Sequence, residues 1–297
     1  MFDFVQMLVS GIASGSAYAL MGLAMVIIYK TSKIPNFAQG EMALAPSFFA
    51  YMLIDSYHLP FYIACILTFG FSVFLGCMIE IIVLRKAQKS NVLGMIIITI
   101  GLEMILLGFV SWKFGAEPKS MPFPISPYDS IPMKDLIKGT DLIIGTLELF
   151  TFTIALILMI IIFLFFKFTK FGIAMKATQQ NQVIARAMGI NTRRIQMMTW
   201  AISSFVGCIA GLLVSSITLH PYMMWDPMLK GFSAAVLGGM ASLPGSIIGA
   251  YIIGILESLF GGYISIEFKS VVSLMIIVVV LCIKPSGLFA RHYIKKV

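Results

Sequence analysis

Long apolar runs alternate with short polar segments along the whole chain. The runs cover about 4–29, 41–54, 60–84, 92–112, 146–167, 197–219, 231–260 and 268–284. A helix needs about 20 apolar residues to cross the hydrocarbon core of a bilayer. Because lipid offers the backbone no hydrogen-bond partners, these runs are predicted to be helical. The pattern indicates an all-α polytopic membrane protein, with a single transmembrane domain over residues 1–297.

The composition supports this class. Of the 297 residues, 59% are hydrophobic and only 11% are charged, against about 45–50% apolar and about 25% charged in soluble domains. A soluble enzyme, a secreted disulfide scaffold and a disordered chain are therefore excluded. The first apolar run follows no basic segment, so it is predicted to be a membrane helix rather than a cleaved signal peptide. The four cysteines and three histidines show no ligand spacing, and no metal site is predicted.

Basic residues mark one side of the membrane. Fifteen of the 21 follow the first, third, fifth and last runs. The other six, Lys230 among them, are interpreted as lying in loops on the opposite side, where acidic residues such as Asp226 balance them. Because cytoplasmic loops carry the excess of Lys and Arg, we expect the N-terminus and a loop at about 113–145 outside. The C-terminus is expected in the cytoplasm of a bacterial or archaeal cell, with the chain in its inner membrane. The net charge of +8 thus needs no nucleic-acid partner.

This orientation constrains the run at 231–260, which must leave and return to the same side. Its 30 residues would span only about 45 Å as a helix, too little for two full crossings. We therefore predict two short helices broken at 242–245, where the chain reads Ser-Leu-Pro-Gly, and about eight segments in all.

Two patterns recur roughly 200 residues apart. The string GEMALAP at 40–46 is similar to GGMASLP at 238–244, and Gly11 and Gly15 recur as Gly207 and Gly211. The first run and the run at 197–219 are expected to cross in opposite directions. The recurrence therefore indicates inverted-topology repeats with broken helices in matching places. A chance match in a chain rich in Gly, Ala and Met is the alternative.

Carboxylates inside apolar runs are costly and are therefore candidates for function. Glu80 lies one turn before the basic residues at 85–89, toward which it is expected to extend, and Glu148 lies at the edge of its run. Glu103 is near the middle of its run, and Glu257 lies in the second half of the predicted broken pair. For these two, lining or gating of a path and an interhelical hydrogen bond remain open alternatives.

The segment at 35–41 places Pro, Gly and several polar groups between two apolar runs. One interpretation is a cytoplasmic turn with Glu41 near a helix N-terminus, which favours negative charge. The other is an unwound element whose Asn36 and Gln39 face a translocation path. We favour the turn as the simpler interpretation.

The only sizeable loop on the basic side covers about 168–196 and carries no acidic residue. A stripe with helical spacing is formed there by Val183, Ile184, Ala187 and Met188. Gly189 then ends the helix. Such an amphipathic helix lies on lipid headgroups or docks to a partner protein, and Arg193 and Arg194 fit either alternative.

The chain lacks a Walker A phosphate loop and the fingerprints of hydrolases, zinc peptidases and dinucleotide-binding proteins. If ATP drives transport, another chain must therefore hydrolyse it. Three functions remain. They are an importer powered by separate ATPase subunits, a secondary transporter coupled to protons through Glu103 or Glu257, and an integral membrane enzyme, for which no cluster of catalytic residues is found.

Several short strings in a fixed order resemble one family. They are NFAQGE at 36–41, MGINT at 188–192, AGL at 210–212, FSAAVLGG at 232–239, LPG at 243–245, GILE at 254–257 and KPSGL at 284–288. Together they extend over nearly the whole chain. They are similar to the membrane permease subunit of branched-chain amino-acid ABC transporters, the LivH type, which often has His in place of Gln39.

The resemblance implies import of leucine, isoleucine, valine or similar small amino acids and amides, with no cofactor bound by this chain. The implied partners are a second homologous permease, two cytoplasmic ATP-binding subunits that hydrolyse ATP, an extracytoplasmic substrate-binding protein and the lipid bilayer. The loop at 172–191 is then similar to a coupling helix that docks into an ATPase. Its contact residues are expected to be Gly172, Ala177, Ile184, Ala187, Met188, Gly189, Ile190, Arg193 and Arg194. The substrate path is expected to include Asn36, Gln39, Glu41, Glu103, Ser242, Pro244, Gly245 and Glu257.

Overall fold

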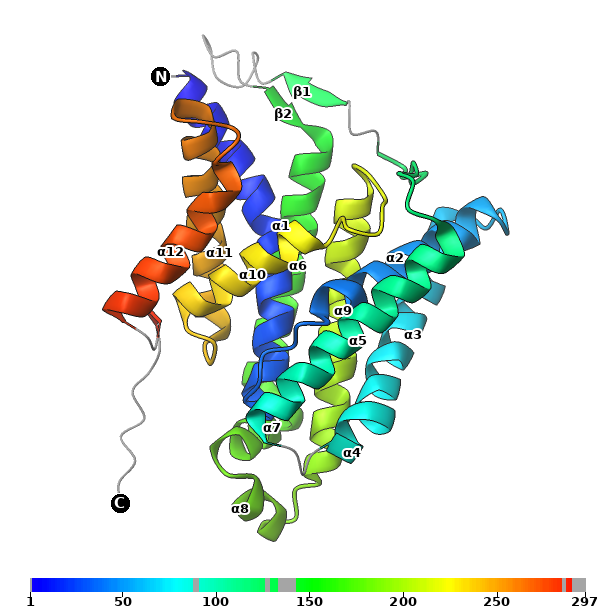
Figure 1. The fold of residues 1–297 in the computed structure, drawn as a ribbon, viewed down its shortest axis with the longest axis vertical. Helices are drawn as coiled ribbons and strands as arrows, with labels where there is room; N and C mark the ends of the chain where they lie inside the picture. The colour runs from blue at the N-terminus through cyan, green and yellow to red at the C-terminus, as the bar shows by residue number, and fades with distance from the viewer. Residues whose placement is uncertain (1, 88–90, 126–128, 133–142, 285–286, 290–297) are drawn as a thin grey trace.

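A computed structural model describes residues 2–87, 91–125, 129–132, 143–284 and 287–289. The described chain is almost entirely helical (Figure 1). Its elements are α1 (Phe2–Ser32), α2 (Gln39–Asp55), α3 (Phe61–Ile79), the π-helical η1 (Glu80–Leu84), α4 (Arg85–Ala87), α5 (Val92–Phe114), β1 (Ser130–Pro132), β2 (Ile143–Gly145), α6 (Thr146–Phe168), α7 (Lys170–Gln180), α8 (Gln182–Ala187), α9 (Thr192–Ser215), α10 (Trp225–Gly238), α11 (Leu243–Tyr263) and α12 (Lys269–Ile283). The two strands form one short antiparallel pair. The predicted all-α polytopic class is confirmed.

Several sequence predictions fall outside the described residues. They concern Lys89, the stretch 133–142 within the loop expected at 113–145, the dipeptide at 285–286, and the C-terminal residues Arg291, Lys295 and Lys296.

Six helices of the described chain are long and apolar enough to cross a membrane. They are α1, α3 with its continuation to Ala87, α5, α6, α9 and α11. By contrast, α2 has 17 residues and α10 has 14, so they rise about 25 Å and about 21 Å, short of the roughly 30 Å core. The predicted number of eight segments is therefore not confirmed.

The run at 231–260 is divided, but not as predicted. The first helix, α10, begins earlier, at Trp225, and the second, α11, is a full-length helix of 21 residues. The break lies at 239–242 rather than at 242–245. Ser242 caps α11 by accepting a hydrogen bond from Gly245 N at 3.1 Å. Pro244 lies in the first turn, where its missing N–H costs nothing because that position has no partner within the helix. The proline thus begins a helix instead of interrupting one.

The core is built around α1, which is 83% buried over its apolar window. Figure 1 shows α1 running through the middle of the molecule, with α9, α10 and α11 against it. Glycines allow backbone contact here, since a Cβ on Gly254 would lie 2.4 Å from Gly11 O and one on Gly231 would lie 2.9 Å from Gly22 N. The outer helices are much less covered, and α5 is only 11% buried over the same kind of window.

The recurrent glycine pairs occupy corresponding places. Gly11 and Gly15 of α1 pack against α11, and Gly207 and Gly211 of α9 pack against α2. Figure 1 shows α1 and α9 running in opposite directions, as inverted repeats require. The other proposed repeat is wrong as a match of broken helices. Pro46 lies inside α2, whereas 238–244 spans the end of α10 and the start of α11.

Candidate functional site

The segment between α1 and α2 is unwound and buried inside the protein. The helix α1 ends at Ser32, Lys33 has a φ of 62°, and regular helix resumes at Gln39. Asn36 and Gln39 are fully buried, each at 0% exposure. The favoured interpretation as a cytoplasmic turn was therefore wrong, because the apolar residues around these amides enclose them, and the unwound alternative describes the segment better.

The amides of this segment join three helices. Asn36 Nδ2 donates to Gln39 Oε1 at 3.2 Å, and Asn36 Oδ1 accepts from Ala38 N at 3.2 Å. Ser203 Oγ of α9 lies 3.0 Å from Gln39 Oε1 and 2.8 Å from Ala24 O of α1. Because their hydrogen bonds are largely made within the protein, Asn36 and Gln39 first of all hold α1, α2 and α9 in register.

Glu41, unlike Asn36 and Gln39, does not have all its hydrogen bonds made within the protein. Glu41 lies in the first turn of α2 at 4% exposure, and its Oε2 has no hydrogen-bond partner. Glu103 is half-buried near the middle of α5, a helix that packs against α2. Asn36, Gln39 and Glu41 thus lie on the unwound segment and the start of α2, and Glu103 lies on the neighbouring helix α5.

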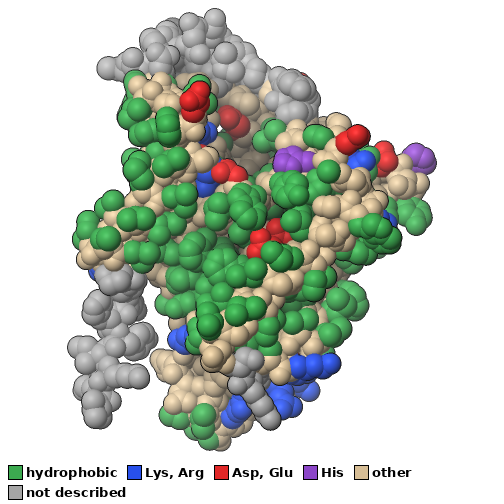
Figure 2. All heavy atoms as spheres, in the orientation of Figure 1, with side chains coloured by type: hydrophobic (Ala, Val, Ile, Leu, Met, Phe, Trp, Pro, Cys, Tyr) green, Lys and Arg blue, Asp and Glu red, His purple; other side chains and the backbone are tan. Residues whose placement is uncertain are grey.

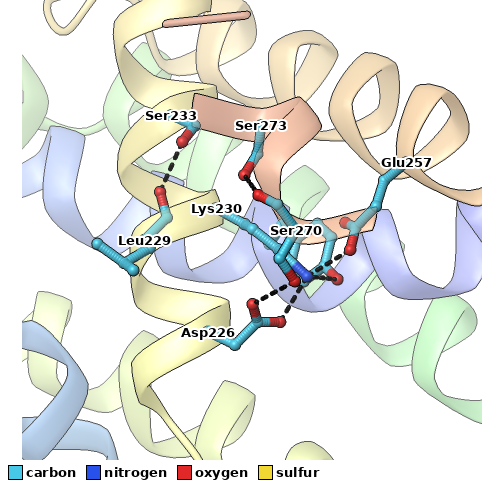
Figure 3. A network of polar contacts seen from close by, with 8 residues as sticks. Asp226, Leu229, Lys230, Ser233, Glu257, Ser270 and Ser273 are labelled. Carbon is cyan, nitrogen blue, oxygen red and sulfur yellow. Dashed lines mark hydrogen bonds and ion pairs between the residues drawn. The ribbon is translucent and has the colours of Figure 1, made fainter. Parts of the chain in front are cut away.

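Glu257 lies in another cluster, with Lys230 at its centre (Figure 3). Lys230 Nζ donates to Glu257 Oε1 of α11, to Asp226 Oδ2 at 2.5 Å and to Tyr18 Oη of α1 at 3.2 Å. Ser270 Oγ of α12 adds a contact of 3.4 Å to Asp226 Oδ1. Of the two alternatives left open for Glu257, the interhelical bond is the one present.

The interpretation of Lys230 as a loop residue was wrong. It lies within α10 at 3% exposure, because two carboxylates and a phenol replace the water that its ammonium would otherwise need. The spacing of Asp226 and Lys230, four residues apart, is the helical ion-pair spacing and was a signal for this arrangement. Tyr18 and Ser203 carried no comparable signal in the sequence.

Ser242, Pro244 and Gly245 lie apart from both clusters, at the start of α11 directly after the tight turn from α10. A Cβ on Gly245 would lie 2.3 Å from Gly238 O, so this turn brings two backbones together. Ser242 makes its hydrogen bonds within the turn and the first turn of α11. The predicted path residues therefore divide into three places rather than one.

Glu80 and Glu148 occupy the places expected of them. Glu80 of η1 accepts a hydrogen bond from Arg85 at 2.7 Å and is nearly fully buried, so it is paired rather than free. Glu148 lies in the first turn of α6. Among the described residues, no group of three His, Cys, Asp or Glu could hold a metal ion.

The predicted coupling residues lie on α7, on α8, in the connection after α8 and at the start of α9, at the lower end of Figure 1. Gly172 and Ala177 belong to the packed part, since a Cβ on Gly172 would lie 2.1 Å from Phe166 O and Ala177 is half-buried. In contrast, Ile184 and Met188 are 61% and 79% exposed. The apolar stripe on α8 is therefore free of the chain's own core.

Local interactions fix where α8, which carries most of this stripe, begins and ends. Asn181 Oδ1 accepts from Val183 N and Ile184 N at the start of α8. Gly189, with a φ of 82°, ends the helix, a conformation that glycine adopts without strain. Ala187, Arg193 and Arg194 are exposed, whereas Ile190 is half-buried. Figure 2 shows Lys and Arg gathered at this end of the molecule, while Asp, Glu and His side chains are more frequent toward the other end.

A cleft of about 470 Å³ opens beside α8. It is lined by Ser32, Ile34, Glu80, Leu84, Val92, Met95, Gln182, Arg186, Gln196 and Trp200. A much smaller cavity, of about 10 Å³, shares five of these residues and extends to Pro35, Asn36 and Thr99. The two cavities thus lead from the basic end of the molecule to the unwound segment and α5.

Comparison with known proteins gives the class. Residues 7–281 match the family described as branched-chain amino acid transport system / permease component. The match covers more than half of the chain, so this protein belongs to that family, whose members are transport permease subunits of ABC systems and not enzymes.

Two named relatives span nearly the full length. The high-affinity branched-chain amino acid transport system permease protein LivH of Escherichia coli (strain K12) is 28% identical over 99% of this chain and 98% of that protein. The probable branched-chain amino acid transport permease protein LivH of Methanocaldococcus jannaschii is 30% identical over 91% of this chain and 87% of that protein. Among solved structures, PsaBC from Streptococcus pneumoniae in complex with Fab matches with a TM-score of 0.48 and 14% identity over 96% of this chain and 93% of that chain, too distant to support an argument.

Proposed function

We propose that this protein imports branched-chain amino acids, or similar small amino acids and amides, across the cytoplasmic membrane. The observation that carries the proposal is the family match over residues 7–281, together with full-length relatives named for branched-chain amino acid transport. No observation favours the alternative of a proton-coupled secondary transporter. Glu257, one of its two candidate carriers, is engaged by Lys230.

Membership of the ABC permease family implies ATPase and substrate-binding partners. The proposed complex contains this chain, a second homologous permease, two ATP-binding subunits and an extracytoplasmic binding protein, with no cofactor bound by this chain. The whole of 1–297 acts as one permease domain. The absence of a Walker A loop from the sequence supports hydrolysis of ATP by separate subunits.

We propose docking of the ATPase on α8 and the adjoining residues. The exposed Ile184 and Met188 offer an apolar contact, and Arg193 and Arg194 border it. Apolar centres rimmed by polar groups are typical of protein interfaces. The gathering of basic side chains at the same end supports its location in the cytoplasm, with the N-terminus and the loop at 113–145 outside.

The test is uptake of labelled leucine by proteoliposomes that contain all proposed subunits. ATP inside the liposomes, on the side of the ATPase subunits, is expected to drive uptake when loaded binding protein is outside. Leucine uptake that is equal with and without ATP, or that an imposed proton gradient drives alone, contradicts the proposal. Glycine and short amides as competitors define the breadth of the substrate class.

A further inference from the structure

The acidic residues inside the apolar helices differ in one respect. Glu80 is paired with Arg85, and Glu257 is paired with Lys230. Within the described part of the chain, Glu41 and Glu103 have no such cationic partner. Uncompensated carboxylates at membrane depth are costly, and proteins keep them where they meet a ligand, an ion or a water-filled path.

Glu41 and Glu103 lie where α2, a tightly packed helix, meets α5, a helix that is mostly uncovered. Glu41 belongs to α2, whose backbone contacts α9 so closely that a Cβ on Gly211 would lie 2.5 Å from Ala43 O. Glu103 belongs to α5, which meets α2 through apolar side chains such as Met42 and Leu102. Only 11% of the α5 window is buried. The seam between α2 and α5 therefore joins a tightly packed helix to one that the rest of the described chain leaves mostly uncovered.

A small cavity near this seam lies between the unwound segment and α5. Below the seam, the cavity of about 10 Å³ is lined by Asn36 and by Thr99, one turn before Glu103 on α5. It adjoins the cleft of about 470 Å³, a volume within the roughly 300–1,000 Å³ range of small-molecule sites. A cavity of that smaller size holds no more than one water molecule, so a solute passes only when the residues that line it move apart.

We propose that Glu41 and Glu103 form the subsite that receives the α-ammonium group of the transported amino acid at the seam between α2 and α5. This inference rests on the proposed function, because a zwitterionic substrate supplies the cation that the two carboxylates lack. A primary ammonium carries three donors, enough for both carboxylates at once. The neighbouring Met42 and Leu102 offer apolar contacts to the branched side chain.

The experiment uses the complete transporter in proteoliposomes with labelled leucine. Glu103→Gln and Glu41→Gln keep the size of the side chain and remove its charge. Each is expected to lower the maximal uptake rate at least tenfold, while ATP hydrolysis stimulated by loaded binding protein remains. Glu103→Asp, which keeps the charge, is expected to retain more uptake than Glu103→Gln. Glu148→Gln, an acid at the start of α6, is the matched control and is expected to transport at the wild-type rate.

A purely structural role predicts a different result. If the two carboxyls only bond neighbouring helices, the Gln variants transport normally or lose the folded complex, and Glu103→Asp behaves like Glu103→Gln. Either outcome overturns the inference. If the wild-type complex transports leucine and the Gln variants transport it equally well, only the inference about Glu41 and Glu103 is overturned. If the wild-type complex transports no amino acid, the proposed function is overturned as well.

Discussion

At the scale of single residues, the Lys230 ammonium is a tightly held polar group of the described chain. It is 3% exposed and shares its protons among Glu257, Asp226 and Tyr18. A buried ion pair is weak support for stability as a whole, but removing one partner leaves the other charge buried and unpaired. The pair is therefore best examined one partner at a time and then together.

Lys230→Met is expected to destabilise the purified protein by about 3–5 kcal/mol, because Glu257 is then left without its cation. The double variant Lys230→Met with Glu257→Gln is expected to recover most of the loss, since no unpaired charge remains. Thermal unfolding in detergent measures both. Lys176→Met, at an exposed position on α7, is the control. A double variant no more stable than Lys230→Met contradicts the pairing as the cause.

The same residue shows what a sequence reveals about a site and what it conceals. The sequence identifies Glu103 and Glu257 as candidates, because a carboxylate inside an apolar run can be recognised from the sequence alone as costly to bury. The partner of Glu257 was not identified, since Lys230 lies 27 residues away in the chain, on another helix. A sequence also does not show how deeply a charged residue is buried. Lys230 was therefore assigned to a loop, although it lies buried within α10.

At the scale of elements, apolar periodicity predicted the long helices well and the short ones poorly. Length decides this, because a run of 20 apolar residues has few alternatives, whereas α2 and α10 are shorter than the membrane is thick. The helix α10 even begins in Trp225 and Asp226, residues that composition assigns to a loop. Close packing against Gly22 and Gly249, rather than local sequence, holds α10 in place.

The short helix α8 carries the element-scale prediction. Ile184→Asp and Met188→Asp place charge on an exposed apolar surface, so neither is expected to change the thermal stability of the permease. Both are expected to weaken its association with the ATPase subunits at least tenfold, because an unpaired carboxylate would be buried in the interface. Co-purification of tagged permease with the ATPase measures this.

Two variants make that experiment specific. Ile173→Asp alters a residue of α7 that is also exposed, at 62%, but lies outside the stripe, and it is expected to bind the ATPase normally. Gly189→Pro changes the end of α8 and is expected to weaken binding as Ile184→Asp does. Undiminished co-purification of Ile184→Asp, Met188→Asp and Gly189→Pro rules out α8 as the docking element.

At the scale of the whole molecule, the distribution of charge supports the proposed orientation of the protein in the membrane. The connection between α2 and α3 and the helix α8 lie toward opposite ends of the molecule (Figure 1). Tyr57 belongs to that connection and is 64% exposed, and Met188 directly follows α8 and is 79% exposed. With the basic end in the cytoplasm, Tyr57→Cys in a cysteine-free background is expected to react with a membrane-impermeant maleimide in intact cells. Met188→Cys is expected to react only in inverted vesicles washed free of ATPase subunits. Labelling of Met188→Cys in intact cells would show that the orientation is the reverse of the proposed one, with α8 outside the cell. An external α8 could not contact ATPase subunits in the cytoplasm, so this measurement tests the coupling mechanism together with the topology.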